Sequence, residues 1–198
     1  MRARTVLAAG AAALVMGVAG CGGSSDSGGG QSTGAVDPNK AEVSPAGDIP
    51  DNQAFVAYSP SGGGYSVKVP EGWGRTASGG AVTFTDKLNA IRIETAPAAA
   101  ALTPSTAKQK ELPQLAHTVK GFQPGSVEIV TRKAGRALRI TYLADAKADP
   151  VTGKTGKDAV ERYVFFHNGK DLVLTLSGPK GADNVDPWMI VTDSVRWS

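Results

Sequence analysis

The sequence predicts an α+β domain in which an antiparallel sheet has helices on both faces, an α/β/α sandwich. Three observations lead to this prediction. Two apolar strands in Asp158–Pro179 are joined at Asn168-Gly169, a pair that favours a two-residue type I′ turn because both positions take positive φ. A second hairpin pattern lies in Ser126–Asp145. Helical patterns occur once in the middle of the chain and once near its end, and we expect them on opposite faces.

The hairpin in Asp158–Pro179 is expected at the centre of the sheet. Pairing of His167 with Lys170 sets its register, which makes one face strongly apolar. The other face is mixed but still apolar in part, whereas a strand with one wet face alternates more cleanly. The predicted pairs are Phe165 with Leu172, Tyr163 with Leu174 and Glu161 with Leu176 on one face, and Phe166 with Asp171, Val164 with Val173 and Arg162 with Thr175 on the other.

The first strands of the domain are short. We expect one at Phe55–Ser59 and one at Tyr65–Val69, where alternation points Tyr65, Val67 and Val69 inward. Pro70 then opens a turn that ends at Trp73, which we place at an edge of the core. The next predicted hairpin pairs residues 82–85 with 88–95 around Asp86-Lys87.

A helix is predicted from Thr103, a suitable N-cap followed by Pro104 at the first helical position. Pro113 should kink or restart this helix, and Gly121 is expected to end it as the C′ residue. The apolar stripe consists of Leu112, Leu115, Ala116 and Val119.

The hairpin in Ser126–Asp145 is predicted to turn at Ala134-Gly135, and its second face is more polar, which favours a place nearer the sheet edge. After it, Asp186-Pro187 resembles the N-cap and first position of a short helix, and Ser194–Trp197 a final strand. At least two of the three tryptophans are expected in the core. The pairs expected in this second hairpin are Thr131 with Leu138, Ile129 with Ile140 and Val127 with Tyr142.

Residues 1–20 have the features of a signal peptide, with Arg2 and Arg4 before an apolar run too short to span a membrane comfortably. The closing Val18-Ala19-Gly20-Cys21 resembles the bacterial lipobox, whose cysteine is acylated. Cys21 is the only cysteine of the chain, so a disulfide framework is excluded. We therefore expect lipidation at Cys21 and export by the general pathway. The alternative is an ordinary signal peptide with an incidental cysteine.

Residues 21–54 are predicted to form a flexible tether, because they lack aromatic residues and are dominated by Gly, Ser, Asp and Pro. The folded domain is expected at residues 55–198. Without Arg2 and Arg4 the chain has 19 basic against 18 acidic residues, a net charge of +1. This balance argues against a nucleic-acid partner. We expect a monomer attached through its lipid to the outer face of the cell membrane.

The stretch from Tyr65 to Trp73, with its Pro-Glu-Gly-Trp turn, resembles the opening strand of PsbP-like domains. The segment Phe165–Ser177 resembles the long central hairpin of that family, and Ser194-Val195-Arg196-Trp197 resembles its end. The family includes photosystem II extrinsic proteins, a Ran-binding import factor and LpqN-type lipoproteins of actinobacterial envelopes. The resemblance implies a sheet sandwiched between helices and a non-enzymatic docking role, but no ligand-binding residue carries over.

Catalytic, metal and cofactor sites are not predicted. Gly153-Lys154-Thr155 lacks the earlier glycine of a phosphate-binding loop, because Ala148 stands there. His117 and His167 are read as solvated or hydrogen-bonded, although a metal shared by histidine with Asp171 or Asp183 is conceivable. Glu161 would have a raised pKa if buried, but a strand-end glutamate more often reaches water.

Three functions remain open at this point. The first is a non-catalytic lipoprotein that binds another envelope protein as an accessory module, with no cofactor. The second is a carrier of a small molecule or lipid in a cavity between sheet and helix. The third, an enzyme, would require polar residues that converge in a cleft, and no such motif is visible in the sequence.

Overall fold

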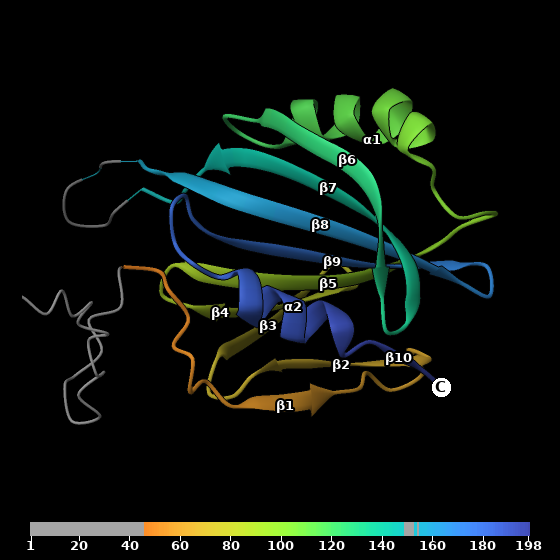
Figure 1. Cartoon of the computed structure of the whole chain (residues 1–198), viewed down its shortest axis with the longest axis horizontal. Helices are drawn as coiled ribbons and strands as arrows, with labels where there is room; N and C mark the ends of the chain where they lie inside the picture. Colours follow the sequence, from red (N-terminus) through yellow and green to blue (C-terminus); the bar gives the residue numbers. More distant parts are fainter. Residues whose placement is uncertain (1–45, 149–152, 154) are drawn as a thin grey trace, which may run out of the picture. The chain divides into compact units, whose positions relative to one another are not determined.

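The structure, a computed structural model, describes residues 46–148, 153 and 155–198. The predicted signal peptide, Cys21, most of the tether and Lys154 lie outside the described residues. The seven-stranded antiparallel sheet has the order β3-β4-β5-β9-β8-β7-β6 (Figure 1). Its strands are β3 Gly74–Ser78, β4 Ala81–Asp86, β5 Asn89–Pro97, β6 Gln123–Arg132, β7 Gly135–Asp145, β8 Lys157–His167 and β9 Lys170–Pro179.

The central position of the β8–β9 hairpin is confirmed, since five other strands flank it in the sheet. His167 pairs with Lys170 and all six predicted pairs are present. Asn168 and Gly169 both have positive φ, 46° and 75°. The positive φ values of the two turn residues agree with the predicted register of this hairpin.

Each face of the sheet has its own hydrophobic core. One core contains Tyr163, Phe165 and Leu174 from the central hairpin, and the other contains Val164 and Val173 from the same two strands. Helix α1 (Pro104–Thr118) packs on the second core, and α2 (Val185–Asp193) packs on the first. The predicted α+β class with helices on both faces is confirmed.

The first and last strands form a separate sheet, which corrects the prediction of a single one. Strand β2 (Tyr65–Pro70) lies between β1 (Phe55–Tyr58) and β10 (Arg196–Trp197), and both pairings are antiparallel. The inward side chains Tyr65, Val67 and Val69 are buried as predicted, and they join the core that also holds α2. This face of the large sheet is thus covered by both a helix and a small sheet (Figure 1).

Helix α1 begins as predicted, because the Thr103 Oγ1 accepts a hydrogen bond from the N–H of Thr106 at 3.1 Å. The helix continues through Pro113, and its C-cap is Val119. Gly121, with φ 66°, follows two residues after the cap, so it is not the C′ residue. Ala116 is exposed and does not belong to the packed stripe, whose members are Ala107, Leu112, Leu115 and Val119.

The β6–β7 hairpin is at the sheet edge as expected, but its turn lies one residue earlier than predicted. Arg132 pairs with Gly135, so Lys133 and Ala134 form the turn. Gly135 uses its positive φ of 116° directly after the turn rather than within it. The register consequently shifts by two residues, with Val127 opposite Ile140 and Ile129 opposite Leu138. A two-residue shift leaves every side chain on its predicted face.

Helix α2 starts earlier than the predicted Asp186-Pro187 pair, because Asn184 is its N-cap. Pro187 falls in the first turn, where a missing N–H has no intrahelical partner to lose. The Asn184 side chain is buried and takes part in an asparagine cluster instead of capping the helix. Its Oδ1 accepts from the N–H of Ile49 at 2.8 Å, and its Nδ2 donates to the Gly47 carbonyl at 3.0 Å and to Asn89 Oδ1 at 3.1 Å.

Residues 46–54 precede the predicted start of the domain at residue 55 but pack against it. Ile49 is part of the core beneath α2. Gly47 lies so close to Pro179 that a Cβ there would be 2.4 Å from the proline Cγ. The packed chain therefore begins before residue 55, and the predicted tether 21–54 is too long at its C-terminal end.

Candidate functional site

An open groove with a volume of about 640 Å³ lies between α2 and the small sheet. We call it the α2 groove. Its exposed apolar surface comes from Ala57 of β1 and from Met189 and Ile190 on the outer side of α2, and its rim is charged. Asp186 and Asp193 lie along it at the two ends of α2. Its principal residues are Val67, Lys68, Lys133, Met189, Ile190 and Arg196.

The apolar surface of the groove results from an excess of apolar residues on α2. The helix buries Pro187, Trp188, Val191 and Thr192 against the core. Met189 and Ile190 point away from it and remain 43% and 45% exposed. A helix that covers a sheet needs one apolar face, so these two large side chains are not required for packing. Adjacent exposed apolar side chains in a hollow are typical of a binding surface.

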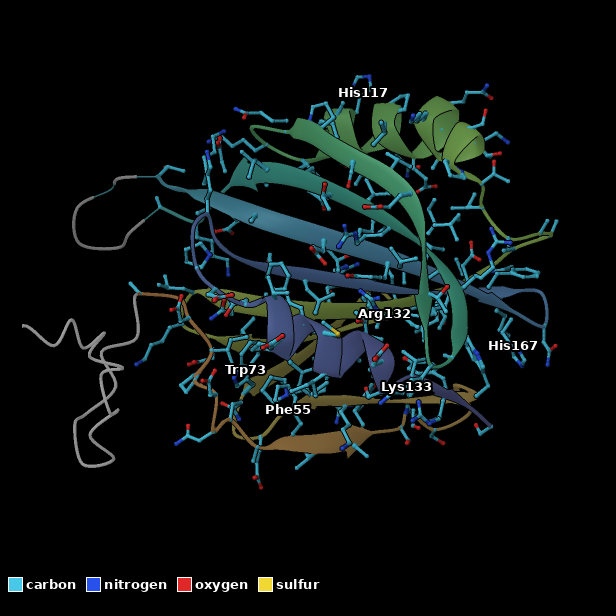
Figure 2. All side chains as sticks on the ribbon, viewed as in Figure 1. Phe55, Trp73, His117, Arg132, Lys133 and His167 are labelled. Atoms are coloured by element: carbon cyan, nitrogen blue, oxygen red, sulfur yellow. The ribbon has the colours of Figure 1, made fainter. Side chains whose placement is uncertain are left out.

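The C-terminal end of α2 is attached to the large sheet by Arg132. Its Nε donates to Thr192 Oγ1 at 2.9 Å, its Nη2 donates to Tyr163 Oη at 3.0 Å, and its guanidinium lies over the Tyr163 ring. Asp193 Oδ1 lies 3.9 Å from the same Nε and accepts from the Lys133 N–H at 3.4 Å. Figure 2 shows Arg132 and Lys133 beside this end of the helix. These contacts set the distance between α2 and the β6–β7 turn.

The sequence left open whether Glu161 is buried or reaches water at the end of its strand. In the structure Glu161 belongs to the same polar network as Arg132 and Tyr163. Its Oε2 accepts from Tyr163 Oη at 2.5 Å, and its Oε1 lies 3.5 Å from Arg139 Nη1. Burial raises the pKa of Tyr163, and its hydrogen bond to Glu161 raises it further. Glu128 extends the network, with 2.6 Å between its Oε1 and Arg139 Nη2. Glu161 therefore has a structural partner on both sides.

The rim of the groove carries three cations at one end of α2. Lys68, Lys133 and Arg196 are all exposed, and none forms an ion pair with another described residue. The Arg196 Nη1 donates to the Asp193 and Val195 carbonyls, which holds its guanidinium at the C-terminus of the helix. Positive charge is thus concentrated where α2 ends.

The two histidines lie on different elements and away from the groove (Figure 2). His117 is exposed on α1. The His167 ring stacks on Trp197 with 4.6 Å between centroids and 12° between planes, beside a hollow of about 200 Å³. Trp188 is buried in the core, whereas Trp73 and Trp197 are only partly buried and pack against it, so one tryptophan instead of the expected two is fully buried. Among the described residues, no three His, Cys, Asp or Glu side chains are grouped to hold a metal.

A second polar cluster lies on the α1 face. Arg162 Nη1 is 3.1 Å from Glu94 Oε1, and its Nη2 is 3.8 Å from Glu111 Oε2 on α1. Burial acts to raise the pKa of Glu94, but the hydrogen bonds and charges of Arg162 and Arg92 bring it below its ordinary value. This cluster ties α1 to β5 and β8.

Asp171 lies in this region, and its Oδ1 is buried without a hydrogen-bond partner, as is the Nε of Arg162. Burial raises the pKa of Asp171, the charge of Glu111 adds to the rise, and Arg162 opposes it. A raised carboxyl pKa means that folding stability falls as the pH rises from the unfolded pKa through the folded one. Asp171→Asn should therefore stabilise the domain at pH 7, by less than about 1 kcal/mol because the group is partly solvated.

Urea unfolding of Asp171→Asn and wild type at pH 7 and pH 3 tests this expectation, with the exposed Asp51→Asn as the control. The difference between Asp171→Asn and wild type should be present at pH 7 and absent at pH 3. A variant less stable than wild type at pH 7 contradicts it.

The hollow between α1 and the sheet bears on the carrier hypothesis. It has a volume of about 200 Å³ and is lined by Leu102, Ile129, Leu138, Val164 and Phe166. Small-molecule sites usually measure about 300–1,000 Å³. This hollow is therefore below the usual size of a ligand site, whereas the α2 groove, at about 640 Å³, is within that range. In the described residues, neither helix has the length and hydropathy to cross a bilayer.

Sequence reasoning missed the groove, although one of its signals was visible. The run Val185–Val191 is apolar at too many positions for a helix with one buried face. The three rim cations could not be connected in the same way, because they come from β2, the β6–β7 turn and β10.

No family model matches the chain, and no curated protein sequence is significantly similar to it. Several solved structures resemble it. Cyanobacterial PsbP (CyanoP) from Synechocystis is 15% identical with a TM-score of 0.51, over 79% of this chain and 99% of that one. The Ran-binding protein Mog1p of Saccharomyces cerevisiae is 11% identical (TM-score 0.47; 73% and 96% covered). LpqN of Mycobacterium tuberculosis, involved in cell envelope biogenesis, is 14% identical (0.42; 73% and 91%).

A Bacteroides thetaiotaomicron protein is also similar, at 17% identity and a TM-score of 0.47, but it is longer. The similarity covers 71% of this chain and 47% of that one, so the chain spans about half its length. At these identities a structural likeness establishes the fold, and the match to CyanoP extends over nearly all of that protein. The described domain has a PsbP-like fold.

Proposed function

We propose that this protein is a non-catalytic, lipid-anchored binding module of the bacterial cell envelope, which docks another envelope protein in the α2 groove. The observation that carries the docking proposal is the pair of exposed side chains on α2. Met189 and Ile190 lie next to each other, and the groove they line is wide enough for protein side chains. Large apolar side chains that a fold does not need for packing are stabilised when a partner covers them.

The anchoring part of the proposal rests on the sequence. The lipobox-like Val18-Ala19-Gly20-Cys21 would give the mature chain an acylated N-terminus. Two or more acyl chains hold a protein at a bilayer, whereas one chain binds only marginally. The Gly- and Ser-rich stretch that follows would let the domain reach proteins around its anchor.

The docking proposal is tested by site-specific photo-crosslinking in intact cells. A photoreactive amino acid replaces Met189 in one strain and Leu88 in another. Leu88 is a matched control, since it is 51% exposed at the β4–β5 turn outside the groove. We expect a discrete crosslinked membrane-fraction protein from position 189 and none from position 88.

Cys21→Ser serves as the anchoring control, because it removes the thiol that would be acylated. Fatty-acid labelling and retention in the membrane fraction should be lost together, and the crosslink from position 189 should weaken. Equal crosslinking from positions 189 and 88, or none from either, would reject docking at the groove. Unchanged membrane retention of Cys21→Ser would reject the lipid anchor.

A further inference from the structure

We infer that the α2 groove recognises a short extended protein segment in which an apolar side chain is adjacent to acidic ones. This inference rests on the proposed docking function and names the chemistry of the partner. It is carried by the arrangement of charge along the groove, which differs between its two ends.

The cationic end of the groove lies at the C-terminus of α2. Lys68, Lys133 and Arg196 line the groove there, and none has a carboxylate partner among the described residues. The Lys68 N–H donates to Ser194 Oγ at 2.7 Å, which places this part of β2 beside the last residue of the helix region. Lys133 is placed there by its backbone contact with Asp193.

The carboxylate of Asp193 does not cancel this charge. The Asp193 Oδ1 accepts from the Lys133 N–H and lies 3.9 Å from Arg132 Nε. The positive charge that faces Asp193 is therefore that of Arg132 on the large sheet, which is not one of the three rim cations. The remaining groove carboxylate, Asp186, belongs to the first turn of α2 at the opposite end. The three rim cations are therefore available to a partner that brings negative charge to one end of the groove.

The dimensions favour an extended segment. Helix α2 has nine residues and is about 14 Å long at 1.5 Å per residue. About four residues of extended chain have the same length. Met189, Ile190 and Ala57 provide exposed apolar surface for one or two side chains along this path. A partner would lay its apolar side chain against α2 and its acidic side chains beyond the end of the helix.

Pairing of the partner as an extra strand of the small sheet is disfavoured by the edge of β2. Strand β10 pairs with Tyr65 and Ser66 along this edge of β2. The next backbone N–H on the same edge, that of Lys68, already donates to the Oγ of Ser194. Recognition must therefore come from side chains. A membrane surface fits poorly too, because a planar bilayer cannot fill a groove between a helix and a sheet.

The test is selection of random heptapeptides displayed on phage against the mature protein, purified from membranes in detergent. We expect the enriched peptides to carry net negative charge with at least one large apolar residue. The Lys68→Glu/Lys133→Glu variant should lose this enrichment. Lys108→Glu/Lys110→Glu on the exposed side of α1 makes the same change in charge elsewhere and should keep it.

A selected peptide with a fluorescent label then gives the size of the effect. Its dissociation constant should rise about tenfold or more in the groove variant, and binding to wild type should weaken with salt. Enriched peptides that are neutral or basic overturn the inference, and so does an acidic preference that survives in the groove variant. Charge-dependent binding to phosphatidylglycerol vesicles without peptide enrichment also overturns it, in favour of a membrane.

The two proposals can fail separately. A position-189 crosslink to a partner segment without acidic residues would leave docking intact and reject the acidic segment. The opposite result is also possible: acidic peptides are enriched on the purified protein in a way that depends on Lys68 and Lys133, but position 189 gives no crosslink in cells. That result would support the recognition chemistry and reject docking of an envelope protein at the anchored domain.

Discussion

Asn184→Ala is expected to lower the free energy of unfolding by about 3 kcal/mol. Asn184 is 3% exposed and makes the central contacts of the asparagine cluster. Its loss leaves the buried N–H of Ile49 and the Oδ1 of Asn89 without partners. A buried donor or acceptor without a partner costs about 1–3 kcal/mol, and two are created here. The Gly47 carbonyl keeps its bond from Asn89 Nδ2.

Urea unfolding followed by tryptophan fluorescence measures the change as a lower midpoint at an unchanged slope. Asn52→Ala is the matched control, because Asn52 is exposed in the same N-terminal segment, and its midpoint should stay at the wild-type value. Asn184→Asp adds a sharper test. The carboxylate still accepts from Ile49 but cannot donate, so the variant should regain stability on acidification. A free energy of unfolding within about 0.5 kcal/mol of wild type for Asn184→Ala would show that water replaces the side chain.

Arg132→Met should destabilise the domain by about 2 kcal/mol and loosen α2. The arginine side chain is 16% exposed and holds Thr192 on the helix and Tyr163 on the sheet. Methionine can fill much of its aliphatic volume but cannot replace these bonds. Removing one partner of a fully buried ion pair costs about 3–5 kcal/mol of folding stability. We expect a smaller loss here because Asp193, which is left without Arg132, can reach solvent.

Arg136→Met is the control on the same hairpin, since Arg136 is exposed and forms no ion pair with a described residue. Amide hydrogen exchange separates a local from a global effect. The α2 amides should exchange faster in Arg132→Met than the β8–β9 amides, because the helix loses its attachment while the sheet centre does not. Equal acceleration in both would mean that Arg132 stabilises the whole fold without a special role at α2.

Local turn chemistry explains why the register of one hairpin was predicted correctly and the turns of two others were not. A type I′ turn needs positive φ at both central positions, and Asn and Gly adopt positive φ most readily. Asn168 and Gly169 therefore favour one alignment of β8 and β9, with both residues inside the turn. Gly135 can serve within a turn or directly after it, and its neighbours Lys133 and Ala134 do not decide between the two. The β4–β5 turn also lies one residue later than predicted, at Lys87 and Leu88. Asn89 is held in the asparagine cluster, so β5 must begin there.

Features that depend on distant contacts were outside the reach of sequence patterns. Strand β3 is exposed at all five residues and shows no alternation, because it is an edge strand that pairs only with β4 in its sheet. The sequence pattern favoured Asp186-Pro187 as the start of α2 instead of Asn184. An asparagine before a helix suggests an N-cap, but the sequence does not show that its side chain binds the distant N–H of Ile49. The groove likewise depends on three cations that only the fold brings together. The apolar excess of α2 was the single local clue.

The asparagine cluster also determines how the domain bears mechanical tension. A pull on the chain before residue 47 acts first on Gly47 and Ile49, which are hydrogen-bonded to side chains at the start of β5 and ahead of α2. The load therefore passes into the large sheet and the helix before it reaches β1. Strand β1, held to the domain by one neighbouring strand, is shielded from being peeled away. A domain dragged by its N-terminal end would keep its small sheet, and with it the α2 groove, intact until these bonds shear.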